Sequence, residues 1–288
     1  MKVRKSEEPR NTPVLVSEHF ELNGDLEFHD IDLENDNKLF LCPYMIENLR
    51  NKNKWANKMT IRAISYFNYV LELLKTKQYK QADKTFTNLN EWNLTRLGMS
   101  AKGFEGKGIN LKSRYLLQCL NADGFILMDY VERIQDLKLF VDGIKDDKVS
   151  DAFTNIIKSI LIEFTQEQCL LHKIPMKPVK VRNIWDDNSK SWITKMVELP
   201  HYKNKPFALV PKECLTTRSW YNATSFARKM VLEDQQSQFI DDKDKPSKKE
   251  LIEKIKNKKW LLNKDYIKHY LAKNKKKSLV NVFRQIKK

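Results

Sequence analysis

The stretch VKVRNIWDDNSKSWITKMVELP, residues 179–200, indicates the class of fold. Both of its halves are rich in β-branched and aromatic residues, and the polar run Asp-Asp-Asn-Ser separates the two halves. Short runs of such residues are typical of strands, and a polar run between them is typical of a turn. Together with an apolar run downstream, the pattern predicts a small antiparallel meander with strands at 179–184, 192–197 and 207–210.

Upstream of this meander, apolar residues recur mainly at helical spacing. They predict helices at 55–75, at 78–89, at 111–120 and from Ser150 or Asp151 to Lys173. Shorter apolar runs predict strands at 39–42 and 137–141, and alternation around Asn-Gly predicts a β-hairpin at 20–28. The expected fold class is α+β, mainly helical, with a small antiparallel sheet and a basic helical C-terminal tail.

Shifts in composition divide the chain into four expected segments. They are an N-terminal extension with the β-hairpin (1–36), a helical core with a glycine-rich loop (37–174), the small β-meander plus a helix (175–242), and the basic helical tail (243–288).

The composition also limits the cellular setting. The chain has 288 residues, of which 41% are hydrophobic, so it is long enough to bury a sizeable core. No signal peptide and no membrane-spanning run is visible, and the cysteines form no Cys-x-x-Cys pair. We expect a cytoplasmic protein that does not engage a membrane.

The positive charge is concentrated at the C-terminus. Residues 243–288 hold 17 basic and 4 acidic residues, a balance of +13 out of the chain's net +16. Such a block attracts polyanions, and DNA or RNA is the commonest partner, although a lysine-rich tail can also serve solubility alone. The lysines expected to contact phosphate there are Lys254, Lys256, Lys258, Lys259, Lys264, Lys268, Lys275, Lys276 and Lys277.

The tail is predicted to be helical rather than extended. Ser247 and Glu250 form a Ser-x-x-Glu capping box just after Pro246, which marks a helix start. Apolar residues then recur at helical spacing over two or three short segments, with lysines on their other faces. The tail should therefore dock by apolar stripes and present its lysines outward.

A glycine-rich loop offers a second place for phosphate. Four of the 7 glycines lie between Gly98 and Gly108, ahead of the helix expected at 111–120. Backbone N–H groups at such a turn can cradle phosphate, with Lys102 and Lys107 beside them. The spacing matches neither a P-loop nor a dinucleotide-binding fingerprint, so a purely structural bend is the alternative.

Acidic residues near 147 suggest metal chemistry. Asp147 and Asp151 stand beside a predicted helix start, where carboxylates can hold Mg²⁺ or Mn²⁺ for phosphodiester cleavage. The alternative is that they cap the helix and complement its dipole.

A second acidic set lies in the meander and resembles the PD-(D/E)xK arrangement of nucleases. Asp187 (or Asp186), Glu198 and Lys212 follow the order acid, acid, lysine, and Glu198 would be a further metal ligand. The sequence departs from that pattern because Val210, rather than an acid, stands two residues before Lys212. Ordinary charges at strand ends are the alternative.

Several segments between residues 39 and 212 together resemble an uncharacterised family of bacterial proteins associated with mobile-element and phage-defence neighbourhoods. They include LFLCPYMIE (39–47), LGMS (97–100), LFVDGI (139–144) and ALVPK (208–212). The sequence departs from the family pattern at Cys42, where the family has Asp. The resemblance implies a context of antiviral defence and no particular chemistry.

The positive charge of the tail, the clustered acidic residues and the family resemblance together predict a cytoplasmic protein that acts on nucleic acid in bacterial anti-phage defence. The leading hypothesis is a metal-dependent endonuclease or nuclease-like subunit, in which Asp147 and Asp151, or Asp187, Glu198 and Lys212, hold metal and water. The alternative is a non-catalytic subunit that binds nucleic acid or a second protein of a defence complex.

Overall fold

The longest described helix, α3 (Lys54–Lys75), is the one around which the other elements pack. Its buried residues recur every three or four positions, as in Met59, Ala63, Phe67 and Val70, so one side of the helix faces the core. Asn53 caps it, because its side-chain oxygen accepts hydrogen bonds from the backbone N–H groups at positions 55 and 56. The helix expected at 55–75 is confirmed.

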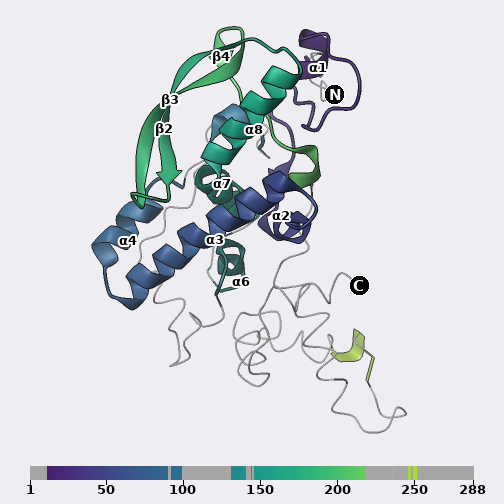
Figure 1. Ribbon diagram of the computed structural model, residues 1–288. Coiled ribbons are helices and arrows are strands. Elements are labelled where there is room, and N and C mark those ends of the chain that lie inside the picture. Colours follow the sequence, from purple (N-terminus) through teal and green to yellow (C-terminus); the bar gives the residue numbers. More distant parts are fainter. Residues whose placement is uncertain are drawn as a thin grey trace, which may run out of the picture.

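The computed structural model describes residues 12–89, 92–98, 131–140, 144, 146–217, 236, 246–247 and 249–251. The remaining described helices are α1 (Val16–His19), α2 (Pro43–Leu49), α4 (Tyr79–Phe86), α6 (Leu137–Phe140), α7 (Asp146–Ile156) and α8 (Lys158–Leu171) (Figure 1). Short 3₁₀ turns lie at Asn93–Thr95, Ile134–Asp136 and Lys212–Cys214. The strands are β1 (Phe40–Leu41), β2 (Met176–Asp186), β3 (Ser191–Tyr202), β4 (Lys205–Pro206) and β5 (Leu215–Thr216).

The long helix expected from about 150 to 173 is two helices, α7 and α8. Ile157 breaks it, with φ −94° and ψ 6°. Every residue from Ala152 to Lys158 is buried, so this segment is covered by protein on all sides. A segment without an exposed face has no periodicity from which to locate the break.

The meander is confirmed, with a correction to its third strand. β2, β3 and β4 pair in that order, and Trp185 faces Trp192 across the first pair. The run 207–210, expected as a strand, belongs to no strand; β4 ends before it. Its backbone N–H groups donate elsewhere: Phe207 to the Pro200 carbonyl, Ala208 to the Leu94 carbonyl, and Leu209 to the Thr165 hydroxyl. The first of these bonds reaches the end of β3, and the other two tie the segment to the 3₁₀ turn at Asn93–Thr95 and to α8.

The β-hairpin expected at 20–28 is wrong. The described part of this region holds α1 and single bridges, including one between Phe28 and Pro211. Side-chain carboxylates take up its backbone donors, as where the Ser17 N–H bonds to Asp30 at 2.9 Å. Phe28 is buried in the core, so its long-range packing overrides the local turn signal of Asn-Gly.

The strand expected at 137–141 is also wrong, since residues 137–140 form α6. A short apolar run is compatible with either a buried strand or a buried helical turn, and periodicity alone does not separate the two.

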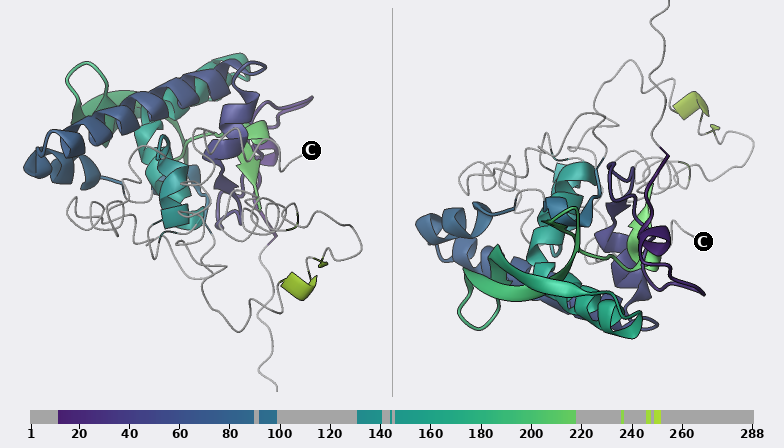
Figure 2. Two further views of the ribbon diagram at one scale, coloured as in Figure 1. Left: turned by 90° about the horizontal axis from the view of Figure 1, so that it is seen from below. Right: turned by 90° about the horizontal axis from the view of Figure 1, so that it is seen from above.

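One hydrophobic core joins the segments that composition had separated. It contains Val16 and Phe28 from the N-terminal region, Phe67 and Phe164 from the helices, and Trp185 from the sheet. The expected boundaries at 36/37 and 174/175 therefore do not separate independent cores. Figures 1 and 2 show the β2–β3 ribbon lying along the outside of the helices, with α1 and α2 away from its turn.

The capping box at the start of the tail is present. The Ser247 N–H donates to the Glu250 carboxylate at 2.7 Å, and the Glu250 N–H donates to the Ser247 hydroxyl at 3.2 Å. The rest of the predicted tail helices, like the helix at 111–120, lies outside the described residues. In the described part of the chain, we find no helix that combines the length and the apolar character needed to cross a bilayer.

Candidate functional site

Asp187, predicted as a catalytic acid, is the anchor of the β2–β3 turn on α3. Its Oδ2 is 2.8 Å from the Arg62 Nε, and its Oδ1 accepts hydrogen bonds from the Ser65 hydroxyl at 3.1 Å and the Trp185 indole at 2.9 Å. Lys190 lies 3.6 Å from the same Oδ1. The protein's own donors thus occupy both oxygens of this carboxylate.

Glu198 and Lys212, the other members of that set, lie elsewhere. Glu198 is exposed on β3 opposite Pro178, whereas Asp186 pairs with Ser191 at the turn. At about 3.3 Å per residue, this register separates Glu198 from Asp186 by roughly 25 Å along the ribbon. Lys212 pairs with Asp25 at 2.5 Å. The structure therefore does not gather the acid–acid–lysine set into one site, because its members belong to opposite ends of a long ribbon and to a separate loop.

Asp147 and Asp151 lie four residues apart at the start of α7, so they project from the same side of the helix. Asp147 is exposed and Asp151 is half-buried. The neighbouring Asp146 forms an ion pair with Lys138. Asp146 and Asp147 lie in the first turn of α7, where a negative charge complements the helix dipole, and Asp151 lies one turn further on.

A metal centre would need more ligands than this pair supplies. Within the ranges that the structure describes, no group of three His, Cys, Asp or Glu side chains is placed to hold a metal ion. Asp147 and Asp151 remain the closest pair among the predicted metal ligands, with Glu198 on another element.

The described cysteines are unsuited to nucleophilic catalysis. Cys42, Cys169 and Cys214 are all buried. Burial raises the pKa of the Cys169 and Cys214 thiols to about 12, so both remain protonated at neutral pH. These two positions serve packing.

The aromatic residues of the ribbon also belong to the core. Trp185 is 1% exposed and contacts Tyr66 and Trp192 edge-on, with ring centroids 4.8 and 5.2 Å apart. The Trp192 indole donates to the Thr85 carbonyl in α4 at 3.0 Å. The Trp185 ring is therefore enclosed, and the half-buried Trp192 packs against the core.

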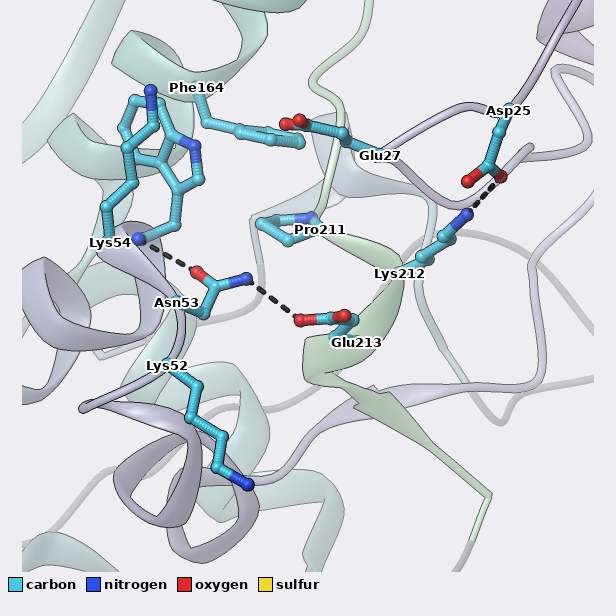
Figure 3. Close-up of a pocket in the computed structure, with 10 residues that line it drawn as sticks. Asp25, Glu27, Lys52, Asn53, Lys54, Phe164, Pro211, Lys212 and Glu213 are labelled. Carbon is cyan, nitrogen blue, oxygen red and sulfur yellow. Dashed lines mark hydrogen bonds and ion pairs between the residues drawn. The ribbon is translucent and has the colours of Figure 1, made fainter.

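A polar pocket of about 380 Å³ lies at the N-terminus of α3 (Figure 3). Most of its charged groups have protein partners: Glu213 accepts from the Asn53 amide at 3.0 Å, and Lys212 pairs with Asp25. Lys54 pairs with Glu167, whereas Lys52 is exposed and has no ion-pair partner among the described residues. The Trp55 indole N–H is enclosed and has no partner in the described part of the chain.

The ribbon carries cations that the sequence interpretation missed. Lys177, Lys180, Arg182 and Lys195 are exposed on β2 and β3. None of the four has an ion-pair partner among the residues that the structure describes. Net charge outside the tail is nearly balanced, and only the tertiary structure separates paired lysines from unpaired ones. The alternation of apolar and basic residues within 179–184 was the sequence signal from which exposed cations on this strand could have been predicted.

The predicted phosphate contacts Lys102 and Lys107 lie outside the described residues. The same holds for the tail lysines at positions 254–277.

Comparison with known proteins finds one family. A profile described as a domain of unknown function, DUF8370, matches residues 20–222. No curated protein and no solved structure matches the chain.

Proposed function

Because the chain belongs to the DUF8370 family, whose description carries no activity, we propose a function from its charges: it binds nucleic acid through phosphate contacts and does not itself cleave it. The C-terminal segment 243–288, with a balance of +13, supplies most of the attraction. This C-terminal segment lies outside the region that matches the family, since the match ends at residue 222.

One contrast carries the proposal. Of the carboxylates suggested for catalysis, Asp187 is paired with protein groups and lies far from Glu198. Asp147 and Asp151 form a pair on α7, with no third ligand grouped with them among the described residues. Four cations on the ribbon, by contrast, lack an ion-pair partner in the described part of the chain. Unpaired exposed cations attract a polyanion, whereas separated carboxylates do not assemble a two-metal site.

The test separates binding from cleavage in one assay. The purified full-length protein is incubated with DNA and with RNA, in Mg²⁺ or Mn²⁺ and again in EDTA. We expect shifted but intact nucleic acid in every condition. Cleavage that EDTA abolishes, and that is lost in Asp147→Ala or Glu198→Ala, would instead establish the metal-dependent nuclease predicted from the sequence.

The context of the function rests on the resemblance to defence-associated proteins. A role in antiviral defence, with a second protein as partner of the basic segment, is tested by counting phage plaques on cells with and without the gene. Equal counts for a broad set of phages would remove that context and leave the binding proposal standing.

A further inference from the structure

We infer that the outer side of the hairpin formed by α3 and α4 is a second phosphate-binding surface, which contacts the sugar-phosphate backbone of duplex nucleic acid. The inference rests on the proposed function and adds a structured contact to the C-terminal segment. Four lysines make up this surface, called here the hairpin surface: Lys75, Lys77, Lys80 and Lys84.

The four lysines are exposed, and they fall within ten consecutive residues. None of them has an ion-pair partner among the residues that the structure describes. Glu72 and Asp83 are the nearest acids along the chain, and neither is ion-paired with one of the four. Residues 72–84 hold four lysines and two acids, so their balance is +2.

The helix α4 directs two of these lysines away from the core. Its buried residues are Ala82, Thr85 and Phe86. Lys80 and Lys84 are four residues apart and therefore lie on the same side of the helix. At 3.6 residues per turn, that side is opposite the buried one.

The other two lysines lie at the end of α3. Lys75 is its last residue, and Lys77 follows in the turn with φ +60°. The Lys77 N–H donates to the Leu74 carbonyl at 3.2 Å, and the Gln78 N–H donates to the Leu73 carbonyl at 2.8 Å. Such a pair of bonds is the Schellman ending of a helix. Backbone hydrogen bonds thus fix the turn, while the Lys77 side chain is exposed.

Contacts with the core hold α4 in place. The Thr85 carbonyl accepts hydrogen bonds from the Tyr66 hydroxyl at 2.9 Å and from the Trp192 indole at 3.0 Å. Tyr66 and Phe86 are both fully enclosed, at 0% and 1% exposed. A surface that is already held by packing loses little conformational freedom when it binds a partner.

The length of the hairpin surface suits a duplex. Lys75 and Lys80 are five residues apart, at most about 18 Å of extended chain, and Lys84 lies about 6 Å beyond Lys80 along α4. Their Cα atoms therefore span less than about 24 Å, which is shorter than one turn of duplex at roughly 34 Å. Figures 1 and 2 show α4 and the end of α3 at one extremity of the described elements, where a long rigid partner can approach.

The absence of exposed apolar side chains on this surface favours a nucleic acid. The exposed large hydrophobic residues of the described chain are Ile61, Leu170, Leu171 and Met196, and none lies within 72–89. A helix that lies on a membrane inserts apolar side chains, and a stable protein interface has an apolar centre. Lysines without such neighbours suit phosphates, whose contacts carry no base sequence.

Helix stability alone does not account for these charges. Lys75 and Lys84 lie in the last turns of their helices, where a positive charge complements the helix dipole. Lys80, by contrast, is the second residue of α4, where a positive charge opposes the dipole. Its charge therefore does not serve the helix.

The test combines four substitutions in the full-length protein: Lys75→Gln, Lys77→Gln, Lys80→Gln and Lys84→Gln. Binding to a duplex of about 20 base pairs is measured across salt concentrations. Four lost phosphate contacts reduce the slope of log affinity against log salt by about 3 to 4 units, and affinity falls at least tenfold. The loss is the same for two duplexes of unrelated sequence, because phosphate contacts carry no sequence information.

A matched variant controls for net charge. It combines Lys38→Gln, Lys52→Gln, Lys173→Gln and Lys205→Gln, at exposed lysines outside the hairpin surface that have no ion-pair partner among the described residues. The variant loses the same charge, and we expect its slope to change by less than about 1 unit. Thermal unfolding of both variants verifies that they remain folded.

A second pair of variants tests the surface at a position where the substitution does not harm the fold. Lys173, after α8, has φ +57°, and its N–H and that of Ile174 donate to the Leu170 and Cys169 carbonyls, the same ending as at Lys77. Glycine adopts this left-handed conformation without strain, so Lys77→Gly and Lys173→Gly unfold at the wild-type temperature or slightly above it. Only Lys77→Gly flattens the salt slope, by about 0.9 units.

Each outcome has one meaning. Wild-type protein that shifts neither DNA nor RNA refutes the proposed function itself. Wild-type binding with equal losses in the hairpin and control variants, or with no loss in the hairpin variant, refutes the hairpin surface and leaves the function intact. Unchanged duplex binding by a hairpin variant that no longer binds phosphatidylserine vesicles would reassign the surface to an anionic membrane.

Discussion

At the scale of single residues, Lys158 is the most unusual group in the described structure. Its side chain is buried, and the ammonium donates to the carbonyl oxygens of Arg182 and Asn183 at 3.3 and 3.0 Å. The Trp92 ring centroid lies 5.4 Å away. Backbone carbonyls and a ring face replace the carboxylate that a buried lysine usually has. It thus ties the start of α8 to the bulge of β2.

Burial lowers the pKa of Lys158 from 10.5 to about 8. Between these two pH values the unfolded chain binds the proton more tightly than the folded chain, so this residue makes the free energy of unfolding rise with pH. The full effect corresponds to about 3 kcal/mol. Lys158→Met retains the length of the side chain and removes the titration.

The measurement is the difference in unfolding free energy between wild type and Lys158→Met at a series of pH values. Taking the difference removes the opposite contribution of Cys169 and Cys214, whose raised pKa values lower stability above pH 9. We expect the difference to shift in favour of wild type from pH 8 to pH 10. A difference that does not change with pH would contradict the lowered pKa of the buried Lys158 ammonium.

Asp187 gives a second prediction at this scale. Asp187→Asn removes the charge that faces Arg62 and leaves that guanidinium without its ion pair. Because both side chains are about one quarter exposed, the expected loss of unfolding free energy is modest, about 1–2 kcal/mol. Chemical denaturation measures it, and Glu198→Gln, on an exposed strand position, is the control with an expected change below about 0.5 kcal/mol.

Nuclease activity, if the assay detects any, distinguishes the two roles of Asp187. A structural anchor changes stability and leaves activity of the folded variant near that of wild type. Abolished cleavage in a folded Asp187→Asn protein would restore the catalytic role that sequence order alone suggested.

At the scale of elements, the start of α3 is set by one side chain. Asn53→Ala removes the acceptor for the backbone N–H groups at positions 55 and 56 and also the amide that donates to Glu213. Loss of such a cap costs about 1 kcal/mol of unfolding free energy. Thermal or urea unfolding tests it.

Asn57→Ala is the matched control in the same helix. Asn57 is exposed within the first turns of α3, where alanine is the better helix former. We expect its stability to equal or slightly exceed that of wild type. Equal losses in both variants would show that residue 53 acts by something other than capping.

The elements also show where local patterns suffice. The helix at 55–75 was predictable because it has one buried face, which imposes a period on the sequence, and the β2–β3 pair was predictable because two strand-forming runs flank a polar turn. The break at Ile157 was not, because residues buried on all sides leave no such period. The helix at 137–140 was not, because so short an apolar run suits a strand or a helix equally.

At the scale of the whole molecule, the charge is unevenly divided between the family-matched body and the C-terminal segment. Residues 243–288 have a balance of +13, and they lie beyond the match at 20–222. If about half of that charge meets phosphates, roughly six counterions are released and the log–log salt slope is near −5.

Truncation after residue 242 tests this division. We expect the truncated protein to bind nucleic acid with a clearly flatter salt dependence, the remainder coming from exposed cations of the body such as Lys180 and Arg182. Its folding is verified by circular dichroism before binding is measured. An unchanged slope would remove the C-terminal segment from the interface.

What the amino-acid sequence determined by itself is the class of fold, the position of the principal helix and meander, the capping box at Ser247 and the uneven charge. These depend on neighbours within a few positions. The tertiary structure decided that Asp187 anchors a turn and that Glu198 lies far from it. It also left Lys180 and Arg182 unpaired on an open face. Whether a charge is paired depends on residues remote in the chain, and only the folded arrangement brings those residues together.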